Sequence, residues 1–481
     1  MIEDVIIIGG GVCGCSLLYE LSRYKIKTLL LEKENDVADG TSKANTAIVH
    51  AGYDPPPGTA MARYNVEGNA LIEQLCADLD VMYKKIGSLV VGFDETDRKA
   101  IENLYIKGNK NAVPGLRIVE SEELFKMEPA LSRDIVCALY APTAAIIAPW
   151  EFAIANAECA VQGGAKVEFN AEVTGIKRGD GHFVVDTTKG EHRARFVVNA
   201  AGVNSDMISE MAEEKFFAIQ PKRGEYYILD TTEAGLVNMV VFPCPSKLGK
   251  GVVVAPTVHG NIIVGPDSAD CGREATENTA AGLEYVAKNA LRCVPSVNLR
   301  ASIRNFSGIR ADAGLEDFIV GESEHTPGFF NIAGIKSPGL TASPAIAKDV
   351  AGMLLGKGLD STSNPDFVAK RKVTRFKLLN DDEKKEAIKK NPLYGSIVCR
   401  CETVTEGEIV DALNRVLPPR SLDAVKRRCA TGMGRCQGGF CGPRVMALIA
   451  KHANVSEINI PLDREGMYIV TGRTKVKRAS L

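Results

Sequence analysis

Four cysteines near the C-terminal end form the densest group of reactive side chains in the sequence. Five of the 13 cysteines lie between residues 399 and 441, and four of these make a C-x-C pair, Cys399 and Cys401, and a C-x4-C pair, Cys436 and Cys441. Four thiolates suit a [2Fe–2S] cluster or a structural zinc ion. Zinc sites more often use C-x2-C pairs, so the spacing favours the cluster, whose sulfides the neighbouring glycine N–H groups could approach. A disulfide framework is not expected, because the long chain has an odd number of cysteines and no signal-peptide pattern at its start.

A second chemical signal lies at the N-terminus. The apolar run Val5–Ile8 leads into Gly-Gly-Gly-Val-Cys-Gly, then a helical pattern, and then a second apolar strand that ends at Glu32. In this G-x-G-x-x-G arrangement Gly9 allows a tight turn, Gly11 lets the backbone approach a pyrophosphate, and Gly14 lets the helix pack on the strand. Glu32 is placed to accept hydrogen bonds from an adenosine ribose and would repel a 2′-phosphate. The segment therefore predicts a site for NAD or FAD rather than NADP.

Three later segments carry a family resemblance. They are a small polar loop at 40–53, an apolar strand that runs into Ala-Ala-Gly at 196–202, and a strand at 329–333 followed by Gly-Ile-Lys-Ser-Pro-Gly-Leu-Thr. With the N-terminal motif they resemble the flavoprotein family that includes D-amino-acid oxidase, glycerol-3-phosphate dehydrogenase and oxidase, and L-2-hydroxyglutarate dehydrogenase. The resemblance covers about residues 1–360 and is closest to the glycerol-3-phosphate and L-2-hydroxyglutarate branch.

This resemblance implies FAD as the cofactor and gives each motif residue an expected contact. The ADP half is expected on Gly9, Gly11, Gly14 and Glu32, the phosphates and ribityl chain on Thr41, Ser42, Asn45 and Thr46, and the adenine on Val173. The pyrophosphate is expected beside Ala200 and Gly202, and the isoalloxazine and ribityl chain beside Gly334, Gly339, Leu340 and Thr341. A helix beginning at Leu340–Thr341 would stabilise negative charge on the reduced flavin.

Oxidation of a secondary alcohol by a flavin also needs a base for the hydroxyl proton and a cation for an anionic substrate. His50 is the first candidate for the base, because its ordinary pKa near 6.5 suits proton transfer and the resembling oxidases carry a histidine there. His259 is a second candidate, with a surface turn as the alternative. Arg310 is the candidate for the anion, because a guanidinium binds a phosphate or carboxylate bidentately. Lys336 and Ser337 are candidates for contact with substrate or flavin, while structural roles for His50 and Arg310 stay open.

The cysteine segment resembles the small helical [2Fe–2S] domain first known from bacterioferritin-associated ferredoxin. The same domain occurs at the C-terminus of the large subunit of anaerobic glycerol-3-phosphate dehydrogenase. Thr405 and Glu408 form a capping box that predicts a helix start. Arg400, Arg428 and Arg435 are expected to offset the negative charge of the cluster. Zinc, or a module without metal, is the alternative.

The two resemblances together imply an α/β and α+β architecture: a Rossmann-like FAD-binding domain interleaved with a mixed-sheet substrate domain, then a small helical four-cysteine domain. The predicted FAD-binding parts are about 1–80, 145–215 and 325–360, the substrate domain is about 81–144 and 216–324, and a linker, the [2Fe–2S] domain and a tail follow at 361–395, 396–455 and 456–481.

The composition excludes several classes of function. The net charge of −2 gives no global field for nucleic acid. No apolar stretch is long and continuous enough to cross a bilayer, so we expect a cytoplasmic protein, or one held at a membrane by a partner.

A cluster joined to a flavin predicts a dehydrogenase that passes electrons to a second redox subunit or acceptor, since the flavin takes two electrons and the cluster carries one at a time. The first choice of substrate is sn-glycerol 3-phosphate, giving dihydroxyacetone phosphate, and L-2-hydroxyglutarate is the runner-up. An amine or imino-acid dehydrogenase of the same fold and an electron-relay subunit without catalysis remain as alternatives.

Overall fold

The computed structural model describes residues 2–212, 215–245, 251–472 and 474, and these form two compact units. Unit 1 comprises residues 1–33 and 37–372, and unit 2 comprises residues 34–36 and 373–481. None of the helices among the described residues is long and apolar enough to cross a membrane.

A mostly parallel sheet forms the half of unit 1 that contains the N-terminus. Its parallel strands follow the order β9-β2-β1-β12-β20, and three antiparallel strands extend it. The bounds are β1 Ile2–Ile8, β2 Thr28–Leu31, β9 Lys166–Glu168, β10 Val173–Arg178, β11 Phe183–Thr187, β12 Gly190–Asn199, β19 Ile319–Glu322 and β20 Phe329–Ala333. Residues 5–8 of β1 are buried on both faces, as expected for a central parallel strand.

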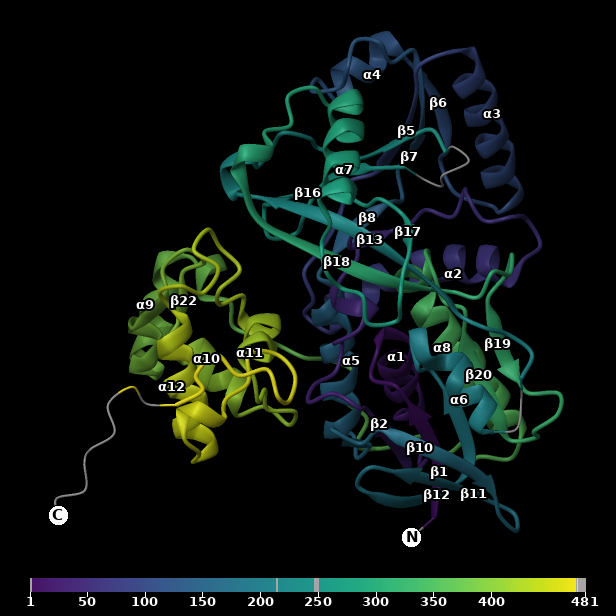
Figure 1. Cartoon of the computed structure of the whole chain (residues 1–481), viewed down its shortest axis with the longest axis vertical. Helices are drawn as coiled ribbons and strands as arrows, with labels where there is room; N and C mark the ends of the chain where they lie inside the picture. Colours follow the sequence, from purple (N-terminus) through teal and green to yellow (C-terminus); the bar gives the residue numbers. More distant parts are fainter. Residues whose placement is uncertain (1, 213–214, 246–250, 473, 475–481) are drawn as a thin grey trace. The chain divides into compact units, whose positions relative to one another are not determined.

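Helices cover this sheet. The first turn of α1 lies next to the carboxyl ends of β1 and β12. α1 packs against α5 and α8, and α2 packs along α8 (Figure 1). The bounds are α1 Val12–Leu21, α2 Ala60–Asp78, α5 Pro149–Gln162, α6 Ser205–Met211 and α8 Gly339–Gly356.

The other half of unit 1 is a nine-stranded mixed sheet with its own buried core. Figure 1 shows it, with α3, α4 and α7, at the end of unit 1 away from the N-terminus. The bounds are β5 Ser88–Gly92, β6 Arg117–Glu120, β7 Cys137–Ala141, β13 Gln220–Leu229, β14 Val240–Pro243, β15 Val253–Pro256, β16 Ile262–Gly265, β17 Ala269–Asp270, β18 Ser302–Asp312, α3 Glu95–Lys110, α4 Ser121–Met127 and α7 Ala280–Cys293. A small sheet of β3 Ile48–Val49, β8 Ala145–Ile147 and β4 Tyr83–Lys85 completes the unit.

The segment predicted as a linker is divided between the units. Residues 361–372 are fixed to unit 1: the Asn364 amide donates to Ser22 O (3.0 Å) and Gly163 O (2.8 Å), and Arg371 forms a buried ion pair with Glu158 (2.6 Å). The rest belongs to unit 2, where Asn380 and Glu383 form a capping box at the start of α9. Long-range contacts of this kind leave no mark in a polar stretch of sequence.

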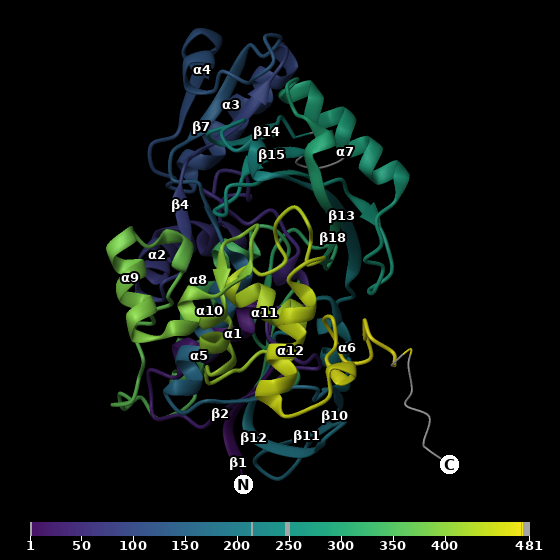
Figure 2. The same cartoon turned by 90° about the vertical axis from the view of Figure 1, so that its left-hand side faces the viewer.

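Unit 2 is a helical module with one short hairpin (Figure 2). The capping box predicted at Thr405 and Glu408 begins α10. Residues 456–470, predicted as tail, instead pack on the module, since Ile460 and Val470 join its core. Residues 473 and 475–481 lie outside the described residues. The bounds are α9 Asp381–Lys390, β21 Ile397–Cys399, β22 Val404–Thr405, α10 Glu406–Leu413, α11 Leu422–Cys429 and α12 Gly442–Ala453.

Candidate functional site

The glycine-rich turn between β1 and α1 has the backbone shape that the sequence predicts. Gly9 has φ +109°, and a Cβ there would lie 2.5 Å from Ala200 O. A Cβ at Gly14 would lie 2.0 Å from Gly9 O, so neither position accepts a side chain. At Gly11, the N-cap of α1, the nearest atom to a Cβ is Ser42 Oγ at 3.4 Å. The helix therefore begins at an open backbone position with no acidic side chain in its first turn, which fits the pyrophosphate of FAD.

Glu32 lies at the end of β2 beside the same turn. Its Oε2 accepts the Gly10 N–H at 2.6 Å. The carboxylate thus orders the turn itself, beside the ribose position that the family resemblance implies.

The loop that carries Thr41, Ser42 and Asn45 uses these side chains to fix its own course. Thr41 Oγ1 donates to Ile309 O (2.6 Å), the Asn45 amide donates to Thr41 O and Ser42 O (both 3.0 Å), and Ser42 Oγ accepts the Val12 N–H (2.9 Å). The loop thus lies on the N-terminus of α1, and a ligand would meet its backbone at least as much as its side chains. Thr46 is half-buried beside them.

The remaining predicted cofactor contacts lie at strand ends and at a helix start of unit 1. Val173 opens β10 and is 7% exposed. Ala200 and Gly202 follow β12, and the Ala200 N–H donates to Ile8 O. Gly334 follows β20 with φ +65°, while Gly339, Leu340 and Thr341 form the first turn of α8. Carboxyl ends of parallel strands are where open α/β sheets bind their ligands.

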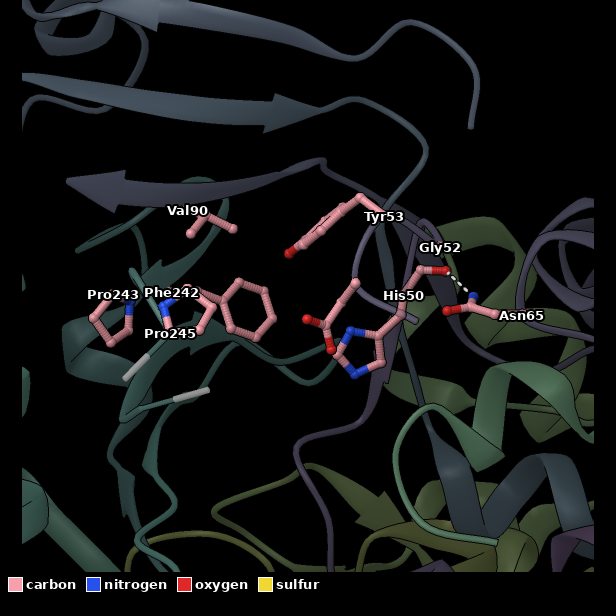
Figure 3. A pocket seen from close by; sticks show the side chains of 9 residues that line it. His50, Gly52, Tyr53, Asn65, Val90, Phe242, Pro243 and Pro245 are labelled. Atoms are coloured by element: carbon pink, nitrogen blue, oxygen red, sulfur yellow. Dashed lines mark hydrogen bonds between the residues drawn. The ribbon is translucent and has the colours of Figure 1, made fainter. Parts of the chain in front are cut away.

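His50 lies directly after β3 in an open pocket with about 360 Å³ of empty space (Figure 3). Its Nε2 is 3.1 Å from Ser337 Oγ, and its backbone N–H donates to Thr341 Oγ1 at 2.9 Å. The amides of Asn65 and Asn69, one turn apart on α2, hold its carbonyl at 2.8 and 3.1 Å. Three predicted residues from distant segments, His50, Ser337 and Thr341, thus meet in one place.

Several lining residues of this pocket were not among the predicted site residues. Phe242 faces the His50 ring at 5.9 Å between centroids, and Tyr53 and Asp54 follow His50 closely in sequence. That proximity, and two asparagines spaced four apart on a helix, are the signals that could have found them. The full lining is His50, Gly52, Tyr53, Asp54, Asn65, Val90, Phe242, Pro243 and Pro245.

Arg310 lies on β18 and is not among the residues that line the His50 pocket. Its guanidinium donates to Asp267 O (3.2 Å) and lies over Gly224, where a Cβ would be 2.5 Å from Nη2. Lys336, which precedes Ser337 in sequence, forms an ion pair with Asp312 (2.8 Å) and donates a hydrogen bond to a backbone carbonyl. It therefore holds the turn that carries Ser337 against the end of β18. Burial opposes ionisation of Asp312, but the hydrogen bonds from Lys336 and the Gly314 amide and the charges of Lys336 and Lys222 together lower the pKa of that carboxyl.

His259 lies in the turn between β15 and β16, apart from the His50 group. Its ring stacks on Trp150 at the start of α5, with 5.9 Å between centroids and 4° between planes. Stacking on the one tryptophan of the chain gives it a packing role in unit 1.

In unit 2 the four predicted cysteines meet as two pairs. Cys401 Sγ and Cys436 Sγ are 3.7 Å apart, and the thiols of Cys399 and Cys441 are hydrogen-bonded to each other. Cys399 and Cys441 are buried, whereas Cys401 is exposed and Cys436 is half-buried. Two facing pairs of thiols fit a centre with two irons.

Backbone amides point at these sulfurs. Cys399 has its pKa lowered to about 6, first by the hydrogen bond from Cys441 and, against its burial, by the amides of Gly432 and Glu402. The amides of Phe440 and Gly438 lower the pKa of Cys436. Such donors favour thiolates and fit an anionic cluster.

Of the three arginines expected to offset the cluster charge, Arg428 is occupied elsewhere. Its guanidinium makes two hydrogen bonds to the buried Asp36 (2.8 and 2.9 Å), and Arg427 adds a third (3.0 Å). Burial opposes ionisation of Asp36, yet the two arginines together lower the pKa of its carboxyl. Arg400 and Arg435 are exposed near the cysteines. The partner of Arg428 could not be predicted because almost four hundred residues of chain separate the two.

Comparison with known proteins agrees with both sites. The family model described as FAD dependent oxidoreductase matches residues 4–353, and the BFD-like [2Fe-2S] binding domain matches residues 397–451. A glycerol 3-phosphate dehydrogenase from Caloramator mitchellensis is 46% identical over 98% of this chain and 99% of its own. A mitochondrial L-2-hydroxyglutarate dehydrogenase from Arabidopsis thaliana is 29% identical over 73% of this chain and 83% of its own.

A solved structure resembles unit 1. The dithionite-reduced L-alpha-glycerophosphate oxidase from Mycoplasma pneumoniae with FAD bound has a TM-score of 0.74 at 33% identity, covering 78% of this chain and 99% of that one. The predicted fold class and both predicted cofactors are confirmed. With an FAD site in unit 1 and a [2Fe–2S] site in unit 2, the chain belongs to the FAD dependent oxidoreductase family.

Proposed function

We propose that the chain is a dehydrogenase of sn-glycerol 3-phosphate that forms dihydroxyacetone phosphate and passes the electrons to a partner. The observation that carries this is the 46% identity to a glycerol 3-phosphate dehydrogenase along the full length of both chains, cysteine domain included. When bound, FAD supplies the acceptor for the hydride from C2 of the substrate, and the cluster supplies a one-electron carrier.

The chain's own contribution to this reaction begins with His50. Its Nε2 takes the proton of the C2 hydroxyl, which leaves the oxygen as a carbonyl when the hydride departs. Ser337 Oγ, 3.1 Å from that nitrogen, is its hydrogen-bond partner until the substrate hydroxyl takes this place, and Asn65 and Asn69 hold the His50 backbone. The base is therefore fixed before substrate arrives.

Arg310 is the proposed anchor for the phosphate. Gly224 leaves room for its guanidinium, and the Asp267 carbonyl holds one edge of it. A planar guanidinium binds two phosphate oxygens at once, so it would also set which carbon of the substrate faces the flavin.

The cysteine domain supports a dehydrogenase over an oxidase. The Mycoplasma pneumoniae oxidase is matched over 99% of its length by 78% of this chain, so about a fifth of this chain has no counterpart in it. A carrier that holds one electron at a time gives the reduced flavin an outlet other than oxygen. We propose a second redox protein as that outlet. The cytoplasmic location expected from the sequence stays a prediction.

The test is anaerobic bleaching of the flavin absorbance by a panel of substrates. Glycerol 3-phosphate is expected to bleach it within seconds at millimolar concentration, followed by cluster reduction seen by electron paramagnetic resonance. Bleaching by L-2-hydroxyglutarate alone would transfer the assignment to that substrate, and bleaching by proline or glycine alone would make the chain an amine dehydrogenase. A chain that none of them reduces, but that a reduced carrier does, would be an electron-relay subunit.

A further inference from the structure

An aromatic side chain stands next to the cysteines on the surface of unit 2. Phe440 is 86% exposed, more than any other large hydrophobic side chain among the described residues. It precedes Cys441 in sequence, and its amide points at Cys436. Because the Cys401 and Cys436 pair is the exposed one, Phe440 marks the side of the module from which an electron has the shortest way out.

The two segments that carry the cysteines and Phe440 are basic. Arg400, Arg435 and Arg444 are exposed, and the segments 399–401 and 432–444 that carry them contain no Asp or Glu. The nearest acid along the chain, Glu402, is buried and pairs with Lys377 at 3.3 Å. Arg444 is held in place by Ile397 O at 2.9 Å. In a chain with a net charge of −2, this is a local excess of one sign.

We propose that this surface, defined by Phe440, Arg400, Arg435 and Arg444, docks a small acidic one-electron carrier protein of the ferredoxin or flavodoxin type. Aromatic and arginine side chains are the groups that most often anchor protein interfaces. Small electron-transfer interfaces rely on complementary charge to bring the partners together quickly. The inference rests on the proposed cluster and names the class of partner that discharges it.

The test measures docking in a direction that needs no substrate. A reduced plant-type ferredoxin, which is acidic, is mixed with the oxidised holoenzyme, and one electron passes from its cluster to the cluster of the chain. The second-order rate constant is expected to fall about tenfold for Arg400→Glu and for Phe440→Ser, and to fall with rising salt in the unaltered chain. Lys451→Glu, which makes the same change of charge at the far end of α12, is expected to alter the rate less than twofold.

Two further measurements separate this role from others. Calorimetric binding of a redox-inactive, gallium-substituted ferredoxin is expected to weaken in parallel in Arg400→Glu and Phe440→Ser, with the iron content of the chain unchanged. A basic cytochrome c used as the oxidant is expected to react faster with Arg400→Glu than with the unaltered chain.

The proposal is overturned if the two variants match the unaltered chain with ferredoxin, or if Lys451→Glu slows transfer as much as they do. It is also overturned if they instead slow reduction of the cluster by substrate within the chain, since the surface would then serve the flavin unit. Failure of glycerol 3-phosphate to bleach the flavin would refute the proposed function and leave the ferredoxin result intact.

Discussion

The dinucleotide site of unit 1 and the cysteine site of unit 2 are built from different atoms of the chain. At the first, Gly9, Gly11 and Gly14 expose backbone, and nearby polar side chains turn inward to hold the loops. At the second, four side chains are the ligands, and the backbone amides only support them. A backbone site is lost when a side chain is added, whereas a side-chain site is lost when one atom is removed.

The largest expected effect is at the side-chain site. Cys401→Ser replaces a thiolate by a poor ligand, so we expect complete loss of the cluster, read as iron per chain and electron paramagnetic resonance. Flavin content and bleaching by substrate are expected to stay within twofold of the unaltered chain. Cys429→Ser is the matched control, because the Cys429 thiol is not one of the four predicted ligands and donates a hydrogen bond to Val425 O. Loss of flavin in Cys401→Ser would show that the two sites are not separable.

The backbone site breaks in the opposite way. Gly14→Ala places a methyl group 2.0 Å from Gly9 O, so the turn must shift, and we expect purified protein with less than a tenth of the normal FAD. Gly352→Ala in α8 has open space around its new methyl group and is expected to raise stability by about 0.5–1 kcal/mol. Absorbance at 450 nm and thermal unfolding give both results. Normal FAD content in Gly14→Ala would contradict the close packing of that turn.

His50 sharpens the comparison because its side chain is expected to act in the reaction, although it lies in the unit whose cofactor site is made mostly of backbone. For His50→Asn we expect flavin content to stay normal and the rate of flavin reduction by glycerol 3-phosphate to fall about 10²–10⁴-fold. Stopped-flow absorbance without oxygen measures the rate. Ser337→Ala should cost less, about tenfold, because Ser337 bonds to the ring only until the substrate hydroxyl takes its place. An unchanged rate in His50→Asn would favour an amine substrate, which needs no such base.

A smaller effect is expected at Asp36. Asp36→Asn removes the buried carboxylate that Arg427 and Arg428 share, while Arg427 keeps its ion pair with Asp463 at 3.1 Å. Removal of one partner of a buried ion pair costs about 3–5 kcal/mol in other proteins. Because the folded-state pKa of Asp36 is lowered, its contribution is present above the unfolded pKa near 4 and is lost as pH falls through the lower, folded value. Loss of iron on acid titration should therefore begin at higher pH in Asp36→Asn. Equal titrations would mean that the two arginines find other partners.

The two sites also differ in how far the sequence predicts them. The geometry of a motif can be predicted when its members are close in sequence, because the local backbone fixes it. Examples are Gly9 to Gly14, Cys399 with Cys401, and Thr405 with Glu408. The meeting of His50, Ser337 and Thr341 followed from the family resemblance, since it depends on the packing of β3 against α8, far away in the sequence. The ion pairs of Lys336 and Arg428 could not be predicted. The sequence shows that each side chain is positive, but not which of the 60 acidic residues lies beside it in the fold.

The membership of residues 34–36 in unit 2 sets a limit on cutting the protein apart. A fragment that starts at residue 373 would keep all four cysteines and every helix of the module, yet it would lack the buried Asp36 carboxylate that Arg427 and Arg428 share. The shortest self-sufficient piece of this electron-carrying module is therefore not a continuous stretch of polypeptide, and transplanting it onto another protein would require an acidic loop supplied by the host.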